Sequence, residues 1–160
     1  MTQGPPHRVV MRRVFPASAA EVYEAWTTPE IMRHWLAPGP NVVISIDADV
    51  SVGGAFHIRS QAPDGVIHII DGKYRQLHPA RRIVMTWAYS GPVALICNME
   101  TLIEVDFEQI ADGHTAMTFT QSQFASTEAA DAYAGDWPSC FTKLEGAVSA
   151  PVDKKSKDQN

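Results

Sequence analysis

His68 and Tyr74 are the side chains whose types and spacing best suit acid–base chemistry in this sequence. They share parity on one expected strand with Ile70 and Gly72, so all four would project from the same face of a sheet. An imidazole and a phenol on the inner face could transfer protons, or could hydrogen-bond a ligand and position it. Two alternatives stay open. The histidine could be structural, which is the commoner role, and the opposite parity could be the inner one because it is also apolar.

Other catalytic patterns are absent from the sequence or have a simpler interpretation. Glu104, Asp106 and Glu108 alternate with apolar residues, which is typical of the solvated face of a strand rather than of paired catalytic carboxylates. The pair Gly53–Gly54 fits neither G-x-x-x-x-G-K-S/T nor G-x-G-x-x-G and precedes a strand, so it predicts a bend in a sheet. No G-x-S-x-G elbow, H-E-x-x-H pair or Cys/His ligand cluster occurs. We therefore expect no metal and no cofactor, and we assign no catalytic residue.

The large aromatic and apolar side chains indicate a binding site more clearly than any catalytic pattern does. On a curved sheet such side chains rarely fill the concave side completely, so a cavity is favoured over a filled core, which is the alternative. The alternation of side chains along the strands selects those that face inward. The candidate ligand-binding residues are Trp35, Phe56, Ile58, His68, Ile70, Tyr74, Met85, Trp87, Val105, Phe107, Met117, Phe119, Gln121, Phe124, Trp137 and Phe141.

The segment from Val93 to Cys97 is a run of apolar residues beside the turn Gly91–Pro92, which is unusual for a solvated hairpin. We expect it to extend the hairpin. A lid over the cavity and a contact between two subunits are the alternatives. The subunit contact would make the protein a homodimer, the commonest oligomeric symmetry.

The elements that position these residues begin with a strand over 8–15, ended by Pro16, which has no amide hydrogen to donate. Ser18 and Glu21 then form an S-x-x-E capping box, which predicts a helix start. A second short helix is predicted at Thr28–Pro29, with the threonine as N-cap and the proline at the first helical position.

Residues 41–121 change to strand-like runs separated by turn signals. Short connections between them predict an antiparallel meander, which with the first strand gives a seven-stranded sheet. The expected strands are 42–48, 55–61, 66–77, 82–89, 101–110 and 114–122.

The C-terminal part, residues 126–148, predicts a helix that is interrupted by Gly135 and Pro138. We expect a break there, with Asp136 as a new N-cap and the proline in the first turn. Beyond the break the apolar residues recur at helical spacing and should face the sheet. They are Trp137, Phe141, Leu144 and Val148. The residues 149–160 lack apolar periodicity and predict a flexible tail.

Length and composition fit one globular domain, over residues 1–148, of a soluble protein. The chain has 160 residues, of which 45% are hydrophobic, and a net charge of −5. That charge, with no cluster of Lys and Arg among aromatic residues, argues against nucleic acid as a partner. No apolar stretch is long enough for a signal or a membrane span, so we expect a cytoplasmic protein without a membrane partner. Cys97 and Cys140 fit no disulfide or metal pattern and should behave as small buried hydrophobic residues.

Several runs taken together resemble a known family. They are AEVYEAWTTPEIMRHWLAP, DVSVGGAF at 49–56, GKYRQLHP at 72–79, RIVMTW at 82–87, VDFEQIADGHTAMTFTQSQF and GDWPSCFTKL. The sequence is similar to the START-like (SRPBCC) superfamily, and within it to the branch named after the activator of the Hsp90 ATPase. The resemblance covers residues 8–148. It implies an α+β helix-grip fold, a seven-stranded curved antiparallel sheet around a long C-terminal helix with two short helices.

Two positions depart from the pattern of that family. Ser51 stands where an arginine is usual, and Asp136 separates a glycine and a tryptophan that are usually adjacent. The resemblance and the aromatic set together predict binding of a small apolar or amphipathic molecule in an internal cavity. One alternative is an activator of an Hsp90-type chaperone ATPase, with the chaperone as partner. Another is a cyclase- or hydrolase-like enzyme, which would need an acid or a base inside the cavity.

Overall fold

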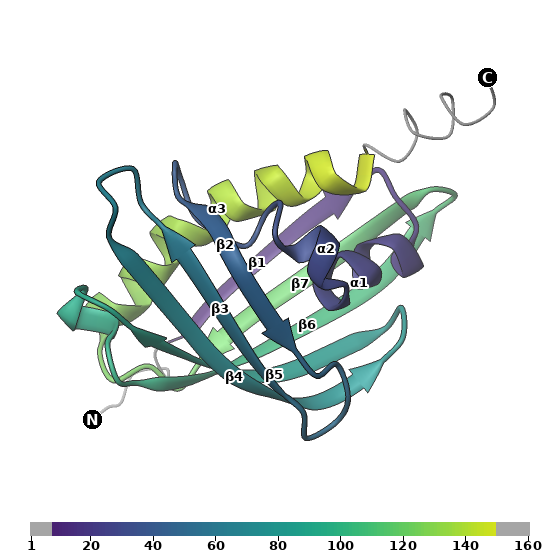
Figure 1. Cartoon of the computed structure of the whole chain (residues 1–160). Coiled ribbons are helices and arrows are strands. Elements are labelled where there is room, and N and C mark those ends of the chain that lie inside the picture. The colour runs from purple at the N-terminus through teal and green to yellow at the C-terminus, as the bar shows by residue number, and fades with distance from the viewer. Residues whose placement is uncertain (1–7, 150–160) are drawn as a thin grey trace, which may run out of the picture.

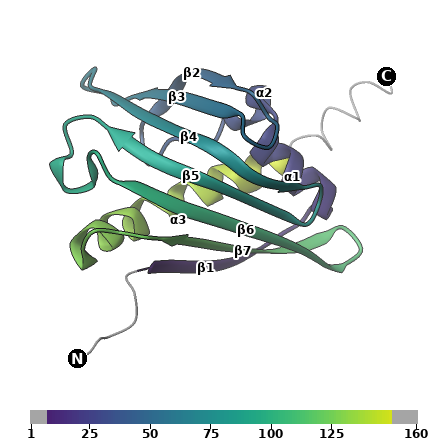
Figure 2. The same cartoon turned by 90° about the horizontal axis from the view of Figure 1, so that it is seen from below.

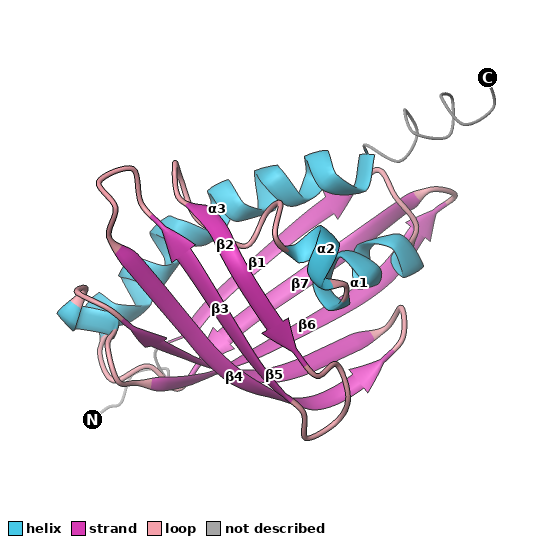
Figure 3. Ribbon diagram, in the orientation of Figure 1, coloured by secondary structure: helices cyan, strands magenta, loops and turns pink. Residues whose placement is uncertain are grey.

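The chain folds into one curved sheet that wraps around a long helix (Figure 1). The computed structural model describes residues 8–149. The strands are antiparallel in the order β1-β7-β6-β5-β4-β3-β2, and α1 and α2 cover one end of the concave side (Figure 3). The elements are β1 (Arg8–Phe15), α1 (Ala19–Thr27), α2 (Pro29–Met32), β2 (Val42–Ala48), β3 (Ala55–Gln61), β4 (Ile67–His78), β5 (Arg82–Ser90), η1 (Ala94–Ile96), β6 (Glu100–Ala111), β7 (His114–Ser122) and α3 (Thr127–Ser149). The predicted α+β helix-grip fold is confirmed.

The sheet is the meander that the turn signals predict. Each strand from β2 to β6 pairs with the strand that follows it in the chain. β1 pairs with β7, and Met11 lies opposite Phe119. Figure 2 shows the strands from the convex side, with α3 behind them. The expected inner residues of β3 and β7, such as Ile58 and Met117, are buried. His68, on β4, also lies on the concave side, which settles the parity that the sequence left open.

The start of α1 follows directly from its sequence. The Glu21 amide donates to Ser18 Oγ at 3.2 Å, and the Ser18 amide donates to Glu21 Oε1 at 2.9 Å. This reciprocal capping box satisfies two amides that the first helical turn would leave free, as predicted. Thr28 takes the N-cap position of α2 without a side-chain hydrogen bond, and Pro29 opens that helix.

The two glycines before β3 form the predicted bend in the sheet. Gly53 has a positive φ of 89°, which glycine adopts without a steric penalty. A Cβ atom on Gly54 would overlap the carbonyl oxygen of Asp49. The Gly53 amide donates to the Tyr74 carbonyl at 2.7 Å, so the bend is held against β4. Ser51 occupies the usual arginine position, and its hydroxyl donates to the Asp49 carboxylate at 2.9 Å.

The predicted break in the C-terminal helix is wrong, because α3 runs without interruption from Thr127 to Ser149 with Pro138 inside it. A proline in a helix costs about 3 kcal/mol. Burial of large side chains on both sides of it, Tyr133 before and Phe141 after, is worth about 1.5–3 kcal/mol each. Packing against the sheet therefore outweighs the local penalty. Asp136 is consequently a residue in mid-helix and not an N-cap.

No helix within residues 8–149 is long and apolar enough to cross a membrane. The predicted tail at 149–160 falls outside the described residues except for Ser149, which ends α3.

The expected extension of the hairpin at Val93 to Cys97 is also wrong. Residues Ala94–Ile96 form the 3₁₀ turn η1, and Ile96 is buried against the concave side. The turn directs Ile96 inward, while Val93 and Leu95 remain exposed. The subunit contact through this segment stays a prediction.

A cluster of aromatic rings fills the end of the concave side that α1 and α2 cover. Trp26 lies 4.6 Å from Trp35 between ring centroids, in an edge-to-face arrangement. Phe119 lies 4.6 Å from Trp137 and 5.3 Å from Phe141. We refer to these five residues as the aromatic core. Such pairs add about 0.5–1.5 kcal/mol each to the burial of the rings themselves.

Candidate functional site

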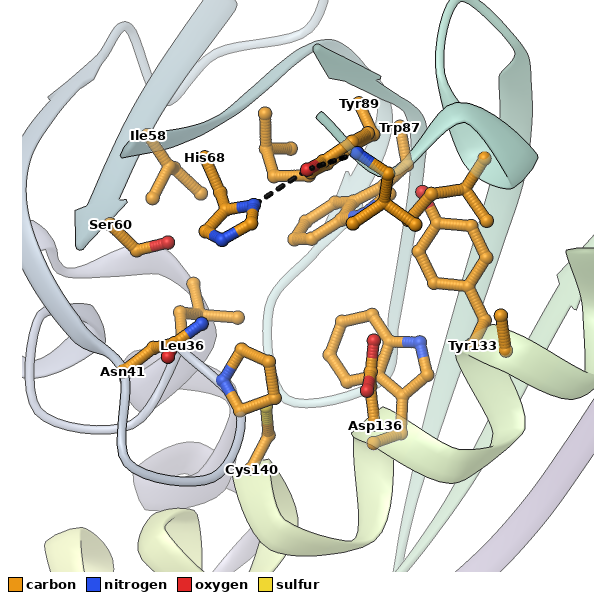
Figure 4. A pocket seen from close by; sticks show the side chains of 16 residues that line it. Leu36, Asn41, Ile58, Ser60, His68, Trp87, Tyr89, Tyr133, Asp136 and Cys140 are labelled. Atoms are coloured by element: carbon orange, nitrogen blue, oxygen red, sulfur yellow. Dashed lines mark hydrogen bonds between the residues drawn. The ribbon is translucent and has the colours of Figure 1, made fainter. Parts of the chain in front are cut away.

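A cavity of about 440 Å³ lies on the concave side, next to the aromatic core (Figure 4). Its walls come from β3, β4 and β5, from η1, from the loop that follows α2, and from α3. The innermost lining residues, such as Ile58, Trp87 and Trp137, are almost completely buried. Asp136 and Val93 are exposed, so they mark the side on which the cavity opens. The structure therefore contains both alternatives that the sequence left open, a filled core at one end and a cavity at the other.

The loop at the cavity opening is tied to α3. Lys143 Nζ donates to the carbonyl oxygens of Ala37 and Asn41, at 2.5 and 3.3 Å. The Gly39 amide donates to Ser139 Oγ at 2.9 Å. These bonds hold the loop after α2 against the helix, so this side of the opening is preformed.

His68 lies in the wall of the cavity and is held by Tyr89. Its Nδ1 atom is 2.6 Å from the Tyr89 hydroxyl, which also accepts a hydrogen bond from the Val93 amide at 3.3 Å. Burial raises the pKa of the Tyr89 phenol, so the hydroxyl keeps its proton and is able to donate it to Nδ1. The proton of a neutral His68 then resides on Nε2. Figure 4 shows that this second ring nitrogen faces the cavity.

The predicted pairing of His68 with Tyr74 does not occur. Six residues along a strand span about 20 Å, so Tyr74 lies far down β4, where it contacts Phe56 instead. Burial raises its pKa to about 12. Tyr89, on the neighbouring strand β5, takes the role that the sequence analysis assigned to Tyr74.

Asp136 supplies the carboxylate of the cavity. It projects from α3 toward the space below Trp87 and beside Tyr133 (Figure 4). Among the described residues, no side chain donates a hydrogen bond to this carboxylate or forms an ion pair with it, and the Ser139 hydroxyl donates instead to the Asp136 backbone carbonyl at 3.0 Å. Partial burial raises its pKa, and the nearby His68 opposes that rise to a smaller extent. With histidine neutral, Asp136 is the one charged residue in the described lining.

The aromatic residues of the wall differ in how their polar atoms are satisfied. The Trp137 indole donates to Gln121 Oε1 at 2.9 Å, and Gln121 in turn donates to Thr101 Oγ1 at 2.9 Å. Trp87 Nε1 and the Tyr133 hydroxyl are buried and have no partner among the described residues. Buried polar groups are almost always hydrogen-bonded, and the one other exception among the described residues, the Tyr74 hydroxyl, lies away from the cavity.

Cys140 places a thiol in the lining. Burial raises its pKa to about 12, so it is protonated and unreactive at neutral pH. Cys140 therefore behaves as the small buried hydrophobic residue that the sequence predicts, whereas Cys97 is only half-buried.

Carboxylates of β6 lie on the outer face, away from the cavity. Arg82 donates to Glu104 at 2.6 Å and to Asp106 at 2.7 Å. Glu108 is exposed on the same strand. This is the solvated face that the alternation predicts.

The predicted site residues fall into two groups. Those that line the cavity are Ile58, His68, Ile70, Trp87 and Trp137. Those that pack elsewhere are Trp35, Phe56, Tyr74, Met85, Val105, Phe107, Met117, Phe119, Gln121, Phe124 and Phe141. Phe56 is an instructive case, because its ring covers Gly72, where a Cβ atom would overlap it. Ligand binding by the first group stays a prediction.

Sequence reasoning missed most of the polar lining. It did not select Tyr89, Tyr133 or Asp136, nor Ser60 and Asn41. The parity of Tyr89 with Trp87 on one strand was a usable signal. The helical spacing of Tyr133, Trp137 and Cys140 was another, hidden by the expected break in α3. The other missed lining residues are Leu36, Pro38, Ala132 and Cys140. Val93 and Ile96 also line the cavity, and they belong to the segment for which a lid was an alternative.

A family model covers almost the whole described chain. The model of the activator of Hsp90 ATPase homolog 1-like proteins matches residues 16–149. The chain belongs to this family. The membership agrees with the helix-grip fold and with the runs of sequence that resemble the family.

Solved structures agree on the fold. A protein of Chromobacterium violaceum superposes with a TM-score of 0.77 at 24% identity, over 89% of this chain and 96% of that one. The AHSA1 protein of Silicibacter pomeroyi superposes with a TM-score of 0.77 at 14% identity, over 90% of this chain and 99% of that one. A protein of unknown function from Staphylococcus aureus superposes with a TM-score of 0.76 at 23% identity, over 91% of this chain and 95% of that one. No curated protein matches the chain. At these identities the likeness establishes the fold alone.

Proposed function

We propose that this family member binds a small apolar or amphipathic molecule in the cavity between α3 and the sheet. The observation that supports it is the cavity itself, of about 440 Å³, beside a densely packed aromatic core. Ligand sites are typically concave, mostly apolar and about 300–1,000 Å³ in volume, with a few placed polar groups. His68 and Asp136 are such groups, and the opening near Asp136 gives access from solvent.

A dye whose fluorescence rises in apolar surroundings tests this proposal. We expect it to bind the folded protein at about one site per chain and to be displaced by lipids or aromatic compounds. Ala132→Trp, on the cavity wall, should reduce binding at least about tenfold by filling the space. Asp131→Trp, at the neighbouring exposed position, is the control and should bind the dye normally. Absence of saturable binding by folded wild-type protein would refute the proposal.

A second candidate function is catalysis of a proton transfer in the same cavity, as in a cyclase- or hydrolase-like enzyme. It is supported by the His68 imidazole, whose orientation Tyr89 determines, with Asp136 in the same lining. If the cavity is catalytic, His68→Gln should lower turnover by about 100-fold or more with little change in ligand affinity. A fall in affinity alone would assign His68 to positioning the ligand.

A third candidate, suggested by the family description, is activation of a chaperone ATPase. It predicts that the purified protein stimulates ATP hydrolysis by an Hsp90-type chaperone in a coupled assay. Filling the cavity by Ala132→Trp would leave such a stimulation intact, because it would depend on an outer surface.

A further inference from the structure

The charged residue in the cavity lining indicates which chemical class of ligand can bind there. If the proposed function holds, a molecule that enters this space meets one ionised group, the Asp136 carboxylate, in the described lining. The other polar side chains of the lining carry no charge when the imidazole is unprotonated, and they include Asn41, Ser60, His68, Tyr89 and Tyr133. The ligand must therefore satisfy a single negative charge at the opening and an apolar surface further in.

Within residues 8–149, no side chain forms an ion pair with the Asp136 carboxylate or donates a hydrogen bond to it. The nearby cation on α3, Lys143, donates to two backbone carbonyls of the loop after α2 and does not line the cavity. The other ion pairs of the described residues lie on the sheet surface or between β1 and α3, such as Arg13 with Glu145 at 3.2 Å. A carboxylate without a partner at the opening of an apolar cavity is stabilised by a cation, which forms a charge-assisted hydrogen bond with it.

The surroundings of that carboxylate also favour a positive charge. Tyr133 and Trp137 on α3 and Trp87 on β5 form an aromatic wall beside it, with ring centroids of the two tryptophans 5.3 Å apart. Aromatic rings attract ammonium groups through the negative potential of their faces. The side chain of Asp136 points into the space below this wall (Figure 4).

An anionic ligand fits the same cavity poorly. A carboxylate or sulfate head group at the opening would lie close to Asp136, and like charges in partly desolvated surroundings repel. The lining offers such an anion only neutral donors, such as His68 Nε2 and Ser60 Oγ. These donors suit an uncharged acceptor atom of the ligand better than a full negative charge.

We propose that the cavity selects an organic cation, an apolar body that carries a protonated or quaternary amino group. The ammonium group pairs with Asp136 at the opening, and the apolar body lies between Trp87, Trp137 and Ile58. The selection arises from the charge of one residue, so a substitution that preserves shape tests it directly.

The test compares three naphthalene derivatives of similar shape by calorimetric titration. They are naphthylmethylamine, naphthylmethanol and naphthylacetate, at about pH 8, where histidine is neutral and the amine is still protonated. We expect wild-type protein to bind the amine about tenfold more tightly than the alcohol, equivalent to about 1.4 kcal/mol, and the acetate more weakly than the alcohol. In Asp136→Asn the ratio of amine to alcohol affinity should fall to about one. Asp131→Asn removes an exposed charge from the same helix outside the cavity and should keep the wild-type ratio.

The outcomes separate this proposal from the proposed function. Equal affinities of wild-type protein for amine and alcohol, or a preference that persists in Asp136→Asn, would overturn cation selection and leave binding in the cavity standing. Failure of all three compounds to bind folded wild-type protein would overturn it as well, and the dye titration would then decide the proposed function by itself.

Discussion

The two ends of the concave side use the same kinds of side chain but fill space differently. At the end covered by α1 and α2, the indole of Trp35 donates to the Ala25 carbonyl at 2.9 Å and that of Trp26 contacts Met117 Sδ at 3.3 Å. At the cavity end, Trp87 Nε1 and the Tyr133 hydroxyl have no such partners among the described residues. Trp137 belongs to both ends. The two ends therefore differ in volume, since packed rings fill one and a cavity remains at the other. Buried polar atoms without a partner do not distinguish them, because the Tyr74 hydroxyl is another such atom and lies away from the cavity.

The largest effect should come from removing a ring of the aromatic core. Phe119 is fully buried and contacts Trp26, Trp137 and Phe141. Phe119→Ala should lower the free energy of unfolding by about 3–5 kcal/mol, because its neighbours cannot collapse into the gap. Denaturant unfolding measures this loss of stability. A loss below about 1.5 kcal/mol would show that this end is not tightly packed and would remove the contrast.

A matched pair of isoleucines sharpens the contrast. Ile103 is fully buried on β6 away from the cavity, whereas the nearly buried Ile58 lines it. Both losses should lie in the range of about 2–5 kcal/mol, with Ile103→Ala the larger by about 1 kcal/mol. Ile58 already faces a space, so its removal forfeits fewer contacts. Equal losses in denaturant unfolding would contradict this reasoning.

Gln121 connects the two ends, and its loss should have an intermediate effect. It accepts from the Trp137 indole and donates to Thr101 inside the fold. Gln121→Leu leaves the buried indole without an acceptor and should cost about 1–3 kcal/mol. It should also weaken dye binding, since Trp137 is no longer held in the cavity wall. Thr118→Leu, outside this network on β7, is the control. An unchanged free energy of unfolding would show that Gln121 does not hold the wall.

The smallest effect on stability should come from Asp136, whose partly desolvated carboxylate lowers the free energy of unfolding. Its folded pKa is raised above 3.8 by partial burial, so the folded state binds protons more tightly than the unfolded state. Stability from this group is therefore present at low pH and is lost as pH rises through the raised pKa. At pH 7, Asp136→Asn should have a higher free energy of unfolding than wild type. The difference should be less than about 1 kcal/mol, because solvent reaches the carboxylate. The difference should vanish in acid. A variant less stable than wild type at pH 7 would point to a structural role.

Local pattern was enough to predict the secondary structure of most of the chain. The strands lie within one residue of their expected ends, and the Ser18–Glu21 capping box forms as predicted. Both features depend on neighbours a few residues apart, through alternation along a strand and hydrogen bonds within one turn. The local rule failed at Pro138, where burial of Tyr133 and Phe141 by a distant sheet keeps the helix continuous.

The sequence by itself therefore determined the elements, their order and the apolar faces, because these follow from spacing along the chain. Only the tertiary structure decided which aromatic residues pack together and which surround a cavity, since both kinds share the same alternation. The partner of His68 shows the reason. Tyr74 lies on the same strand about 20 Å away, whereas Tyr89 is 21 residues distant in sequence and 2.6 Å from the imidazole, because β4 and β5 pair side by side. Asp136 likewise faces the cavity only because α3 remains whole across Pro138 and packs against the curved sheet.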